Sequence, residues 1–458
     1  MSYKQITTTL MSLEEKFNLF SLKQDGVYVW KLIRMPVMTY LISKANNINS
    51  IHGTVGKKEK LLSAVQFFLN SVISNPFFIN RDISKIIIEN PRKIYWNDRI
   101  IDPYTHFFLN ESQDYHVLEN IYKLKHMKSV FKPSSSTHFL LISAYLKKKL
   151  SKKKSFSIQN LDILKLVKQQ IQRELDIEVP IINIALEKYC EFITNYSIYN
   201  SLFKMKKWKE IYIVCSYGKE SIISAAQENN VKVIEFQHGV MGPYHLGYHF
   251  PSLTKVPYFP DEIYLFGDYW DKTTSLPNNT KKNYYGYPYL KEYIYQRRNE
   301  IGNKQRNEIV IVSQGNVGKE LSEFVYNLAV RLTNYSFKYK LHPGEFGRWK
   351  KEYPQLLQMS KLSNVEIIED EKNLYDLFTT SSIVIGVSST AIFEAVAFKV
   401  QPIIVKLSSY EYMLDLNRQF NVPILESSID VEKYILDYEQ EDMQININSL
   451  FKDLKIIN

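Results

Sequence analysis

The stretch that decides the fold is IVIGVSSTAIFEA, residues 383–395. It opens on an almost continuous apolar run, as expected of a parallel strand that is buried on both faces. The run breaks directly into Ser388, Ser389 and Thr390, after which the pattern becomes helical. Hydroxyl groups and backbone N–H groups therefore meet where a helix begins, and such an end attracts anions. The stretch predicts a strand, a phosphate-binding turn and a helix.

The same alternation of strand and helix extends in both directions from this stretch. Upstream it covers about 210–236, and after a Pro-, Asn- and Tyr-rich connection it resumes over 309–405. Repeated strand–helix units build parallel sheets with a ligand crevice beyond the carboxyl ends of the strands. We therefore expect an α/β fold of two Rossmann-like domains facing a central cleft. The domains are predicted to cover 1–275 and 300–435, and 436–458 is expected to be a tail whose helix packs back.

Length and composition are those of a folded globular protein. The chain has 458 residues, of which 45% are hydrophobic and 23% charged, which excludes a disordered or collagen-like protein. Its two cysteines, Cys190 and Cys215, are too few for a disulfide framework. We find no signal peptide and no run of apolar residues long enough to span a membrane. A cytoplasmic location is therefore expected.

His342, Pro343 and Gly344 follow the predicted strand 337–341. Proline keeps the preceding residue out of the helical region, and glycine permits a sharp turn, so His342 is expected to face the cleft. Its imidazole can donate a hydrogen bond to phosphate oxygens. A turn histidine without function is the alternative interpretation.

A third loop follows the strand predicted at 309–312 and contains Ser313, Gln314 and Gly315. It is a further candidate for nucleotide binding, and Glu394 is a candidate for the ribose hydroxyls. The chain has neither a Walker A motif nor a GxGxxG fingerprint, which disfavours P-loop hydrolysis and dinucleotide binding. No Asp-x-Asp pair follows a strand, so we expect no metal and no cofactor.

In the first half, QHGVMGPYHLGYH covers residues 237–249 and contains three histidines. Their spacing fits no standard zinc site. The preferred interpretation is a loop in the cleft that contacts substrate through His238. Near the N-terminus, Asp25 lies beside Gly26 and is a candidate general base, although an aspartate that merely serves a turn is the commoner case.

The net charge is +10, and residues 122–154 alone hold ten lysines with no acidic residue. Lysines interspersed with aromatic and aliphatic side chains can bind anionic lipid headgroups, an anionic polysaccharide or nucleic acid. A solvated lysine-rich loop is equally compatible with this pattern.

Taken together, His342-Pro343 and Ser388-Ser389 resemble the HP and SS motifs of bacterial GT-B glycosyltransferases that move sialic acid or Kdo from CMP donors. Gln237-His238-Gly239 resembles a loop of capsule and surface-glycan assembly proteins. The resemblance covers mainly 230–250 and 309–405, about a third of the chain.

This resemblance implies an inverting, metal-independent glycosyltransferase that uses a CMP-sugar and a glycan or glycolipid acceptor. His342, Ser388 and Ser389 would hold the phosphate of CMP, and Asp25 would be the general base, a role for which His238 is the other candidate. The family's acidic motif differs here, because Gln24 stands at its first acidic position. No nucleic acid is expected, and the lysines over 147–154 would hold the enzyme at the inner face of the membrane.

Three alternatives remain open at the level of sequence. One is a CDP-glycerol or CDP-ribitol polyolphosphotransferase of the teichoic-acid type, which shares the His-Gly, His-Pro and Ser-Ser elements. Another is a sugar-nucleotide epimerase, which shares the two-domain cleft. The third, of a different class, is a non-catalytic polyanion-binding protein.

Overall fold

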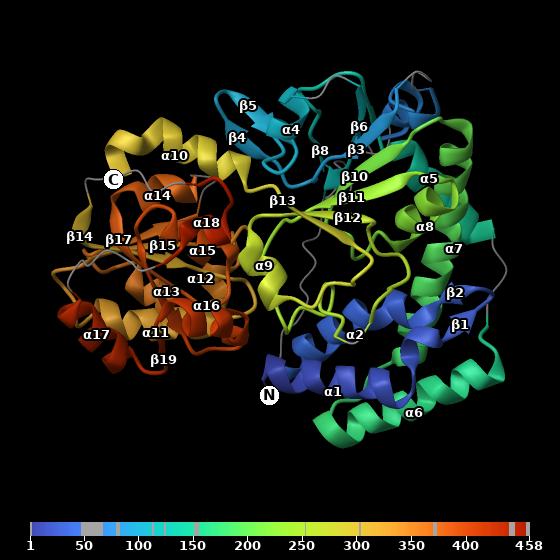
Figure 1. Cartoon of the computed structure of the whole chain (residues 1–458). Helices are drawn as coiled ribbons and strands as arrows, with labels where there is room; N and C mark the ends of the chain where they lie inside the picture. The colour runs from blue at the N-terminus through green and yellow to red at the C-terminus, as the bar shows by residue number, and fades with distance from the viewer. Residues whose placement is uncertain are drawn as a thin grey trace.

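The computed structural model describes residues 2–46, 67–78, 83–111, 114–122, 125–150, 155–251, 253–301, 304–369, 373–438 and 445–454. Two parallel β-sheets lie side by side, each with its own helices, and a layer of helices lies below the first sheet in Figure 1. The first sheet is built from residues 85–284 and the second from 305–425. The α/β class and the two Rossmann-like domains are therefore confirmed.

The first sheet has seven strands in the order β13-β12-β11-β10-β3-β6-β9, and every pair in it is parallel. Its strands are β3 (Lys85–Ile88), β6 (Tyr115–Glu119), β9 (Ser134–Ser136), β10 (Glu210–Val214), β11 (Lys232–Phe236), β12 (Glu262–Leu265) and β13 (Lys281–Tyr284). Helices on one face bury it in an aliphatic core: α5 (His138–Leu150), α7 (Ile181–Met205) and α8 (Glu220–Glu228). Short α4 (His106–Glu111) and the hairpins β4 (Ile94–Trp96)–β5 (Arg99–Ile101) and β7 (Ile121–Tyr122)–β8 (Lys125–His126) adjoin it.

A helical layer lies below this sheet in Figure 1 and was not resolved by the sequence patterns. It consists of α1 (Tyr3–Lys16), α2 (Val29–Ala45), α6 (Ile158–Leu175) and one end of α7, with the hairpin β1 (Lys23–Gln24)–β2 (Val27–Tyr28). These helices share a core that includes Trp30, Leu41 and Val167. Each helix turns an apolar stripe inward, so the layer is stable only as a group.

The second sheet has six parallel strands in the order β16-β15-β14-β17-β18-β19. They are β14 (Gln305–Val312), β15 (Ser336–Lys340), β16 (Val365–Ile368), β17 (Ser381–Gly386), β18 (Gln401–Val405) and β19 (Ile424–Leu425). Alternate residues of β14 enter different cores, since Ile309 and Ile311 pack on one face while Val310 and Val312 pack on the other. Burial on both faces explains the continuous apolar runs in the sequence.

Helices cover both faces of this sheet. They are α11 (Gly318–Ala329), α12 (Trp349–Glu352), α13 (Pro354–Met359), α14 (Leu374–Thr380), α15 (Thr390–Val396), α16 (Leu414–Phe420) and α17 (Ser428–Asp437). The chain forms α9 (Asp268–Thr273) between β12 and β13, and α10 (Pro288–Ile301) connects the first sheet to the second. The chain end returns through α18 (Ile447–Leu450) to the first domain, where the indole N–H of Trp270 donates to the carbonyl of Leu450 at 2.8 Å. This return requires Gly267, because a Cβ there would lie 2.0 Å from the Ser449 carbonyl oxygen.

Candidate functional site

A cavity of about 370 Å³ lies where the two domains meet. Its walls come from the loops after β11, β14, β15 and β17, from the start of α1 and from a loop near residue 410. The lining residues are Tyr3, His238, Gly239, Val240, His245, Gln314, Asn316, His342, Ser388, Ser389, Thr390, Ser409 and Tyr412. None of these described lining residues is Lys, Arg, Asp or Glu, so an anion here would be held by neutral donors.

His342 stands on the C-terminal wall, in the turn after β15. The backbone N–H of Gly344 donates to Nδ1 of His342 at 3.0 Å. Nδ1 is therefore an acceptor, and in the neutral ring the proton resides on Nε2. This tautomer makes Nε2 a hydrogen-bond donor, as phosphate binding requires. Pro343 shares the turn but does not line the cavity.

A buried carboxylate, Glu345, ties this turn to the loop after β14. It accepts the backbone N–H of His342 at 2.7 Å and the hydroxyl of Ser313 at 2.9 Å. The side chain is fully buried, and burial raises its pKa. A Cβ on Gly318 would lie 1.9 Å from Oε1 of Glu345, so any larger residue here would have to displace this carboxyl group. Sequence reasoning missed Glu345, and its only signal there is an acidic residue three positions after His342.

Gln314 connects the loop after β14 to the turn after β17. Its side-chain oxygen accepts the backbone N–H of Ser388 at 2.9 Å. The hydroxyl of Ser388 also lies 2.6 Å from that of Ser409. Of the three candidates at 313–315, only Gln314 lines the cavity, because Ser313 is buried against Glu345. The carbonyl of Gly315, the third, accepts from Arg348 at 2.9 Å.

Ser389 and Thr390 begin α15 at the edge of the cavity. Ser389 is the N-cap, and its oxygen accepts the N–H of Ala391 at 3.3 Å. That bond leaves the hydroxyl proton of Ser389 available to a ligand. The oxygen of Thr390 accepts the backbone N–H of Val240 from the first domain at 3.1 Å. Thr390 therefore links the two domains at the cavity itself.

Glu394 lies one turn further along α15 and does not line the cavity. It is half-buried near aromatic rings and hydrogen bonds with Tyr375, and desolvation raises its pKa to about 7. The structure thus places the predicted ribose ligand among tyrosines that include Tyr104 and Tyr287 rather than in the cavity wall.

His238 stands on the opposite wall, in the loop after β11. Gln237 shapes this loop, because its side chain donates to the carbonyl of Gly239 at 2.9 Å and accepts the N–H of Phe266 at 2.8 Å. Burial lowers the pKa of His238 to about 3, so the ring is neutral near pH 7. Its backbone carbonyl accepts the hydroxyl of Tyr104 at 2.9 Å.

Two tyrosines flank the His238 ring. Nδ1 lies 3.4 Å from the hydroxyl of Tyr248, and Nε2 lies 3.3 Å from that of Tyr217. Tyr248 donates its proton to Glu235, a fully buried carboxylate of β11 whose pKa burial raises. The oxygen of Tyr248 is then left to accept the Nδ1 proton of His238, so the lone pair is on Nε2. Tyr217 faces that lone pair, so a substrate hydroxyl would have to replace its hydrogen bond before His238 could accept a proton. The sequence did not predict a role for Glu235, because it shows only a charged residue inside a predicted strand.

Three further wall residues come from distant parts of the chain. Tyr3 and Tyr412 pack edge to face with ring centroids 5.5 Å apart. His245 accepts the N–H of Gly247 at 3.2 Å, and burial lowers its pKa to about 4. Nothing in the sequence linked Tyr3 or Tyr412 to the site, because their approach depends on how α1 packs against the second domain.

Asp25 is not brought to the cavity. It occupies the β1–β2 turn with φ of +49°, and the hydroxyl of Tyr189 on α7 donates to it at 2.6 Å. The adjacent Gln24 accepts the N–H of Ser157 at 3.0 Å. The turn is therefore held within the helical layer, and the structure does not bring Asp25, the candidate general base, together with the other candidates that line the cavity.

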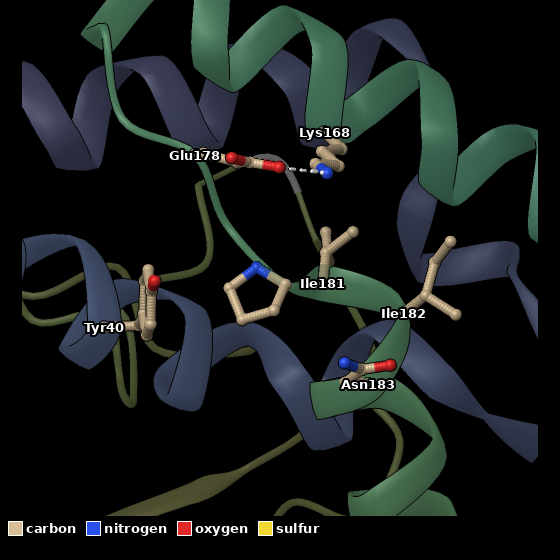
Figure 2. Close-up of a pocket in the computed structure, with 7 residues that line it drawn as sticks. Tyr40, Lys168, Glu178, Ile181, Ile182 and Asn183 are labelled. Atoms are coloured by element: carbon tan, nitrogen blue, oxygen red, sulfur yellow. Dashed lines mark hydrogen bonds and ion pairs between the residues drawn. The ribbon is translucent and has the colours of Figure 1, made fainter.

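A second cavity, of about 510 Å³, lies between α2, α6 and α7 and is drawn in Figure 2. Lys168 and Glu178 form an ion pair of 2.6 Å at its rim, beside Tyr40 and Asn183. It contains none of the candidate residues predicted from the sequence.

The described residues also bear on metal binding and on membrane spanning. Within them, no three His, Cys, Asp or Glu side chains are grouped so as to hold a metal ion. No described helix combines the length and apolar character needed to cross a bilayer. Of the predicted lysine cluster, Lys147, Lys148 and Lys149 are exposed at the end of α5, and residues 152–154 lie outside the described residues.

No family model matches this chain, and no curated protein matches it. Among solved structures, it is similar to UDP-GlcNAc 2-epimerase from Neisseria meningitidis bound to UDP-GlcNAc, with 13% identity, a TM-score of 0.46, and coverage of 80% of this chain and 97% of the other. It is also similar to the wall teichoic acid polymerase TagF, with 11% identity, a TM-score of 0.43, and coverage of 87% of this chain and 94% of the other. For UGT2 of Phytolacca americana the identity is 10% and the TM-score 0.42, with coverage of 79% of this chain and 92% of the other. None of these TM-scores reaches 0.5, and the fold described above rests on this chain's own two sheets.

Proposed function

We propose that this chain is an inverting, metal-independent glycosyltransferase. It would move a sialic-acid-like or Kdo-like sugar from a CMP donor to a hydroxyl of a bacterial surface glycan. The observation that carries the proposal is the meeting of His342, Ser388 and Ser389 in one cavity at the domain junction, opposite His238. Work at the cytoplasmic face of the membrane, where lipid-linked acceptors are found, is part of the proposal.

The C-terminal wall would bind the donor phosphate. Nε2–H of His342 and the hydroxyl of Ser389 can both donate to phosphate oxygens without a metal. In sugar transfer, negative charge grows on the departing phosphate while the sugar becomes oxocarbenium-like. Donors fixed in advance gain strength as this charge develops, and each such donor contributes typically a few kcal/mol to lowering the barrier.

The N-terminal wall would supply the general base. His238 is neutral, and Nε2 carries the lone pair. A bound CMP-sugar adds negative charge beside the ring, which raises the pKa of a nearby imidazole and makes it a better proton acceptor. His238 would then take the proton of the acceptor hydroxyl as that oxygen attacks the anomeric carbon.

The test is a thermal-shift screen with CMP, CDP, UDP and GDP. A ligand at about 100 times its dissociation constant adds roughly 2.7 kcal/mol of stability. We expect CMP to give the largest shift and His342→Ala to abolish it, with Lys361→Ala, an exposed site outside the cavity, as the control. A UDP preference, or a CMP shift that persists in His342→Ala, would contradict the donor assignment.

Product mass then separates the related chemistries. Incubation with CMP-sialic acid, CMP-Kdo and CDP-glycerol should give a glycosylated acceptor with one of the first two. Transfer of a polyol phosphate would identify the teichoic-acid type of reaction, and turnover of a donor without any acceptor would identify an epimerase.

A further inference from the structure

A third cavity, of about 340 Å³, lies between the hairpin β4–β5, helix α4 and helix α10, which are neighbours in Figure 1. We call it the hairpin cavity. It shares no lining residue with the cavity at the domain junction and contains none of the candidates predicted from the sequence. Its volume lies within the range of small-molecule sites in proteins, so its lining decides what kind of ligand it would accept.

The hairpin supplies an aromatic ring and a cation. Trp96 and Arg99 lie directly opposite each other in the β4–β5 ladder. Asn97 and Asp98 join them with φ of +44° and +59°, the left-handed conformation of a tight hairpin turn. Opposed side chains of an antiparallel pair project from the same face, and Trp96 and Arg99 both line the cavity. The turn therefore holds an indole ring and a guanidinium group side by side.

The two helices supply hydrogen-bonding groups and a second ring. His106 and Asn110 lie one turn apart on α4, with Phe107 beside them. Glu292 and Gln296 lie one turn apart on α10, and the amide of Gln296 donates to the Glu292 carboxylate at 2.8 Å. Residues four apart share one face of a helix, so each helix presents a pair of polar side chains to the cavity.

Some of these polar groups have no partner among the described residues. Arg99 forms no ion pair with any of them, although Glu292 lines the same cavity. The side chain of His106 is 8% exposed, and its Nδ1 atom is buried without a hydrogen-bond partner. Buried polar groups in proteins are normally hydrogen-bonded, so an unpartnered one in a cavity wall points to a ligand.

The chemistry of the lining favours a polyhydroxyl ligand. One guanidinium group and one carboxylate leave the cavity without net charge, and Glu292 would repel a phosphate. A carboxylate accepts hydrogen bonds, a guanidinium group donates them and an amide does both, so together they pair well with hydroxyl groups. The rings of Trp96 and Phe107 can cover an apolar surface. A sugar ring combines these features, because hydroxyl groups surround an apolar C–H face.

We propose that the hairpin cavity binds a sugar unit of a glycan. The chain between β5 and α4 connects it to the cavity at the domain junction, because Ile101 lines the first and the hydroxyl of Tyr104 donates to the carbonyl of His238, in the second, at 2.9 Å. Asp102, 1% exposed, holds this connection by accepting the hydroxyl of Thr105 at 2.7 Å. The sugar site would therefore be fixed before its ligand arrives.

This inference goes beyond the proposed function and does not depend on it, because glycan binding needs no donor and no transfer. The labelled full-length protein is applied to an array of neutral and acidic oligosaccharides, and the strongest ligand is then titrated into unlabelled protein while tryptophan fluorescence is recorded. Trp96 is the only one of the five tryptophans that is not buried, so we expect a saturable change in fluorescence. Binding to no glycan, or binding without this change, would overturn the proposal.

Two variants locate the ligand. Trp96→Phe keeps an aromatic ring, so binding should stay within about threefold while the change in fluorescence disappears. Arg99→Ala/Asn110→Ala removes two hydrogen-bonding side chains and should weaken binding about tenfold or more. Both of these side chains are exposed and have no described partner to lose, so the unfolding midpoint should not change. A fluorescence change that persists in Trp96→Phe would overturn the proposal, because the ligand would then lie elsewhere.

Arg173→Ala/Asn299→Ala is the matched control. It makes the same two substitutions at exposed sites of α6 and α10 that lie outside the cavity. It should bind the glycan like the parent protein. An equal loss of binding in this control would show an unspecific effect of charge. Displacement of the glycan by inorganic phosphate at the same concentration would assign the cavity to anions. Either result would overturn the proposal.

Discussion

The two walls of the cavity are built in different ways. The C-terminal wall takes its residues from the ends of three adjacent strands, β14, β15 and β17, and joins them by hydrogen bonds through Glu345 and Gln314. The N-terminal wall combines His238 and His245 with aromatic rings and with Tyr3 from the start of the chain. The first wall is a set of oriented donors, and the second is a buried imidazole environment. The difference indicates a division of work between phosphate binding and proton transfer.

The largest expected difference between the two domains is in how acidification changes their free energy of unfolding. Burial lowers the pKa of five histidines of the first domain to about 3 or 4. They are His116, His138, His238, His245 and His249. The unfolded chain takes up these protons near pH 6.5, so below that pH it binds more protons than the folded chain and the free energy of unfolding falls. Each group contributes up to about 1.4 kcal/mol per pH unit.

In the second domain, acidification has the opposite effect and raises the free energy of unfolding. Glu394 has its pKa raised from 4.5 to about 7, so it is protonated more readily in the folded chain and stabilises the fold as the pH falls through that interval. In the first domain, Asp102, with its pKa raised to about 6, and Glu235, whose pKa burial also raises, oppose the five histidines but are fewer. Hydrogen exchange at pH 7 and pH 5, corrected for intrinsic rates, should show residues 210–284 losing protection before residues 305–405. The reverse order would contradict this difference between the domains.

His238→Asn tests the proposed base. We expect turnover to fall by about 100-fold or more, because general-base catalysis typically contributes that much. The CMP-induced thermal shift should remain, since the donor phosphate is assigned to the other wall. This is the opposite of His342→Ala, which should abolish the shift. If His238→Asn abolished CMP binding as well, the division of work between the walls would be wrong.

Gly318→Ala tests how tightly the C-terminal wall is built. Alanine at the start of a helix normally stabilises it, yet here the added Cβ would lie 1.9 Å from Glu345. We expect the free energy of unfolding to fall by about 1–3 kcal/mol, the usual cost of overpacking. The thermal shift that CMP induces should also decrease, because Glu345 accepts the backbone N–H of His342.

Gly242→Ala is the matched control for that change. Gly242 lies in the loop of the N-terminal wall, where a Cβ would meet nothing within 4 Å. Chemical denaturation should find it within about 0.5 kcal/mol of the parent protein. Equal effects of the two substitutions would show that the contact with Glu345 is not what restricts position 318.

The sequence predicted the C-terminal wall better than the N-terminal wall for a physical reason. Ser388 and Ser389 follow a strand whose apolar run is visible in the sequence, His342 follows a strand that alternates apolar and polar residues, and parallel strands bring their carboxyl ends to one edge. Tyr3, Tyr412 and the helical layer are positioned by packing between segments hundreds of residues apart, which no local pattern records. Glu345 was missed because a buried acid in a turn looks like a surface residue in the sequence.

Asp25→Asn should have the smallest effect of the changes considered. Asparagine tolerates the left-handed backbone conformation at φ of +49° and can accept the hydroxyl of Tyr189 as aspartate does. We expect turnover within about twofold of the parent protein, because a change outside the cavity removes no transition-state interaction. A steady-state assay should measure the turnover of Asp25→Asn and of His238→Asn under the same conditions. If Asp25→Asn lost as much turnover as His238→Asn, the helical layer would have to approach the cavity during the reaction, and the proton acceptor would be a carboxylate rather than a buried imidazole.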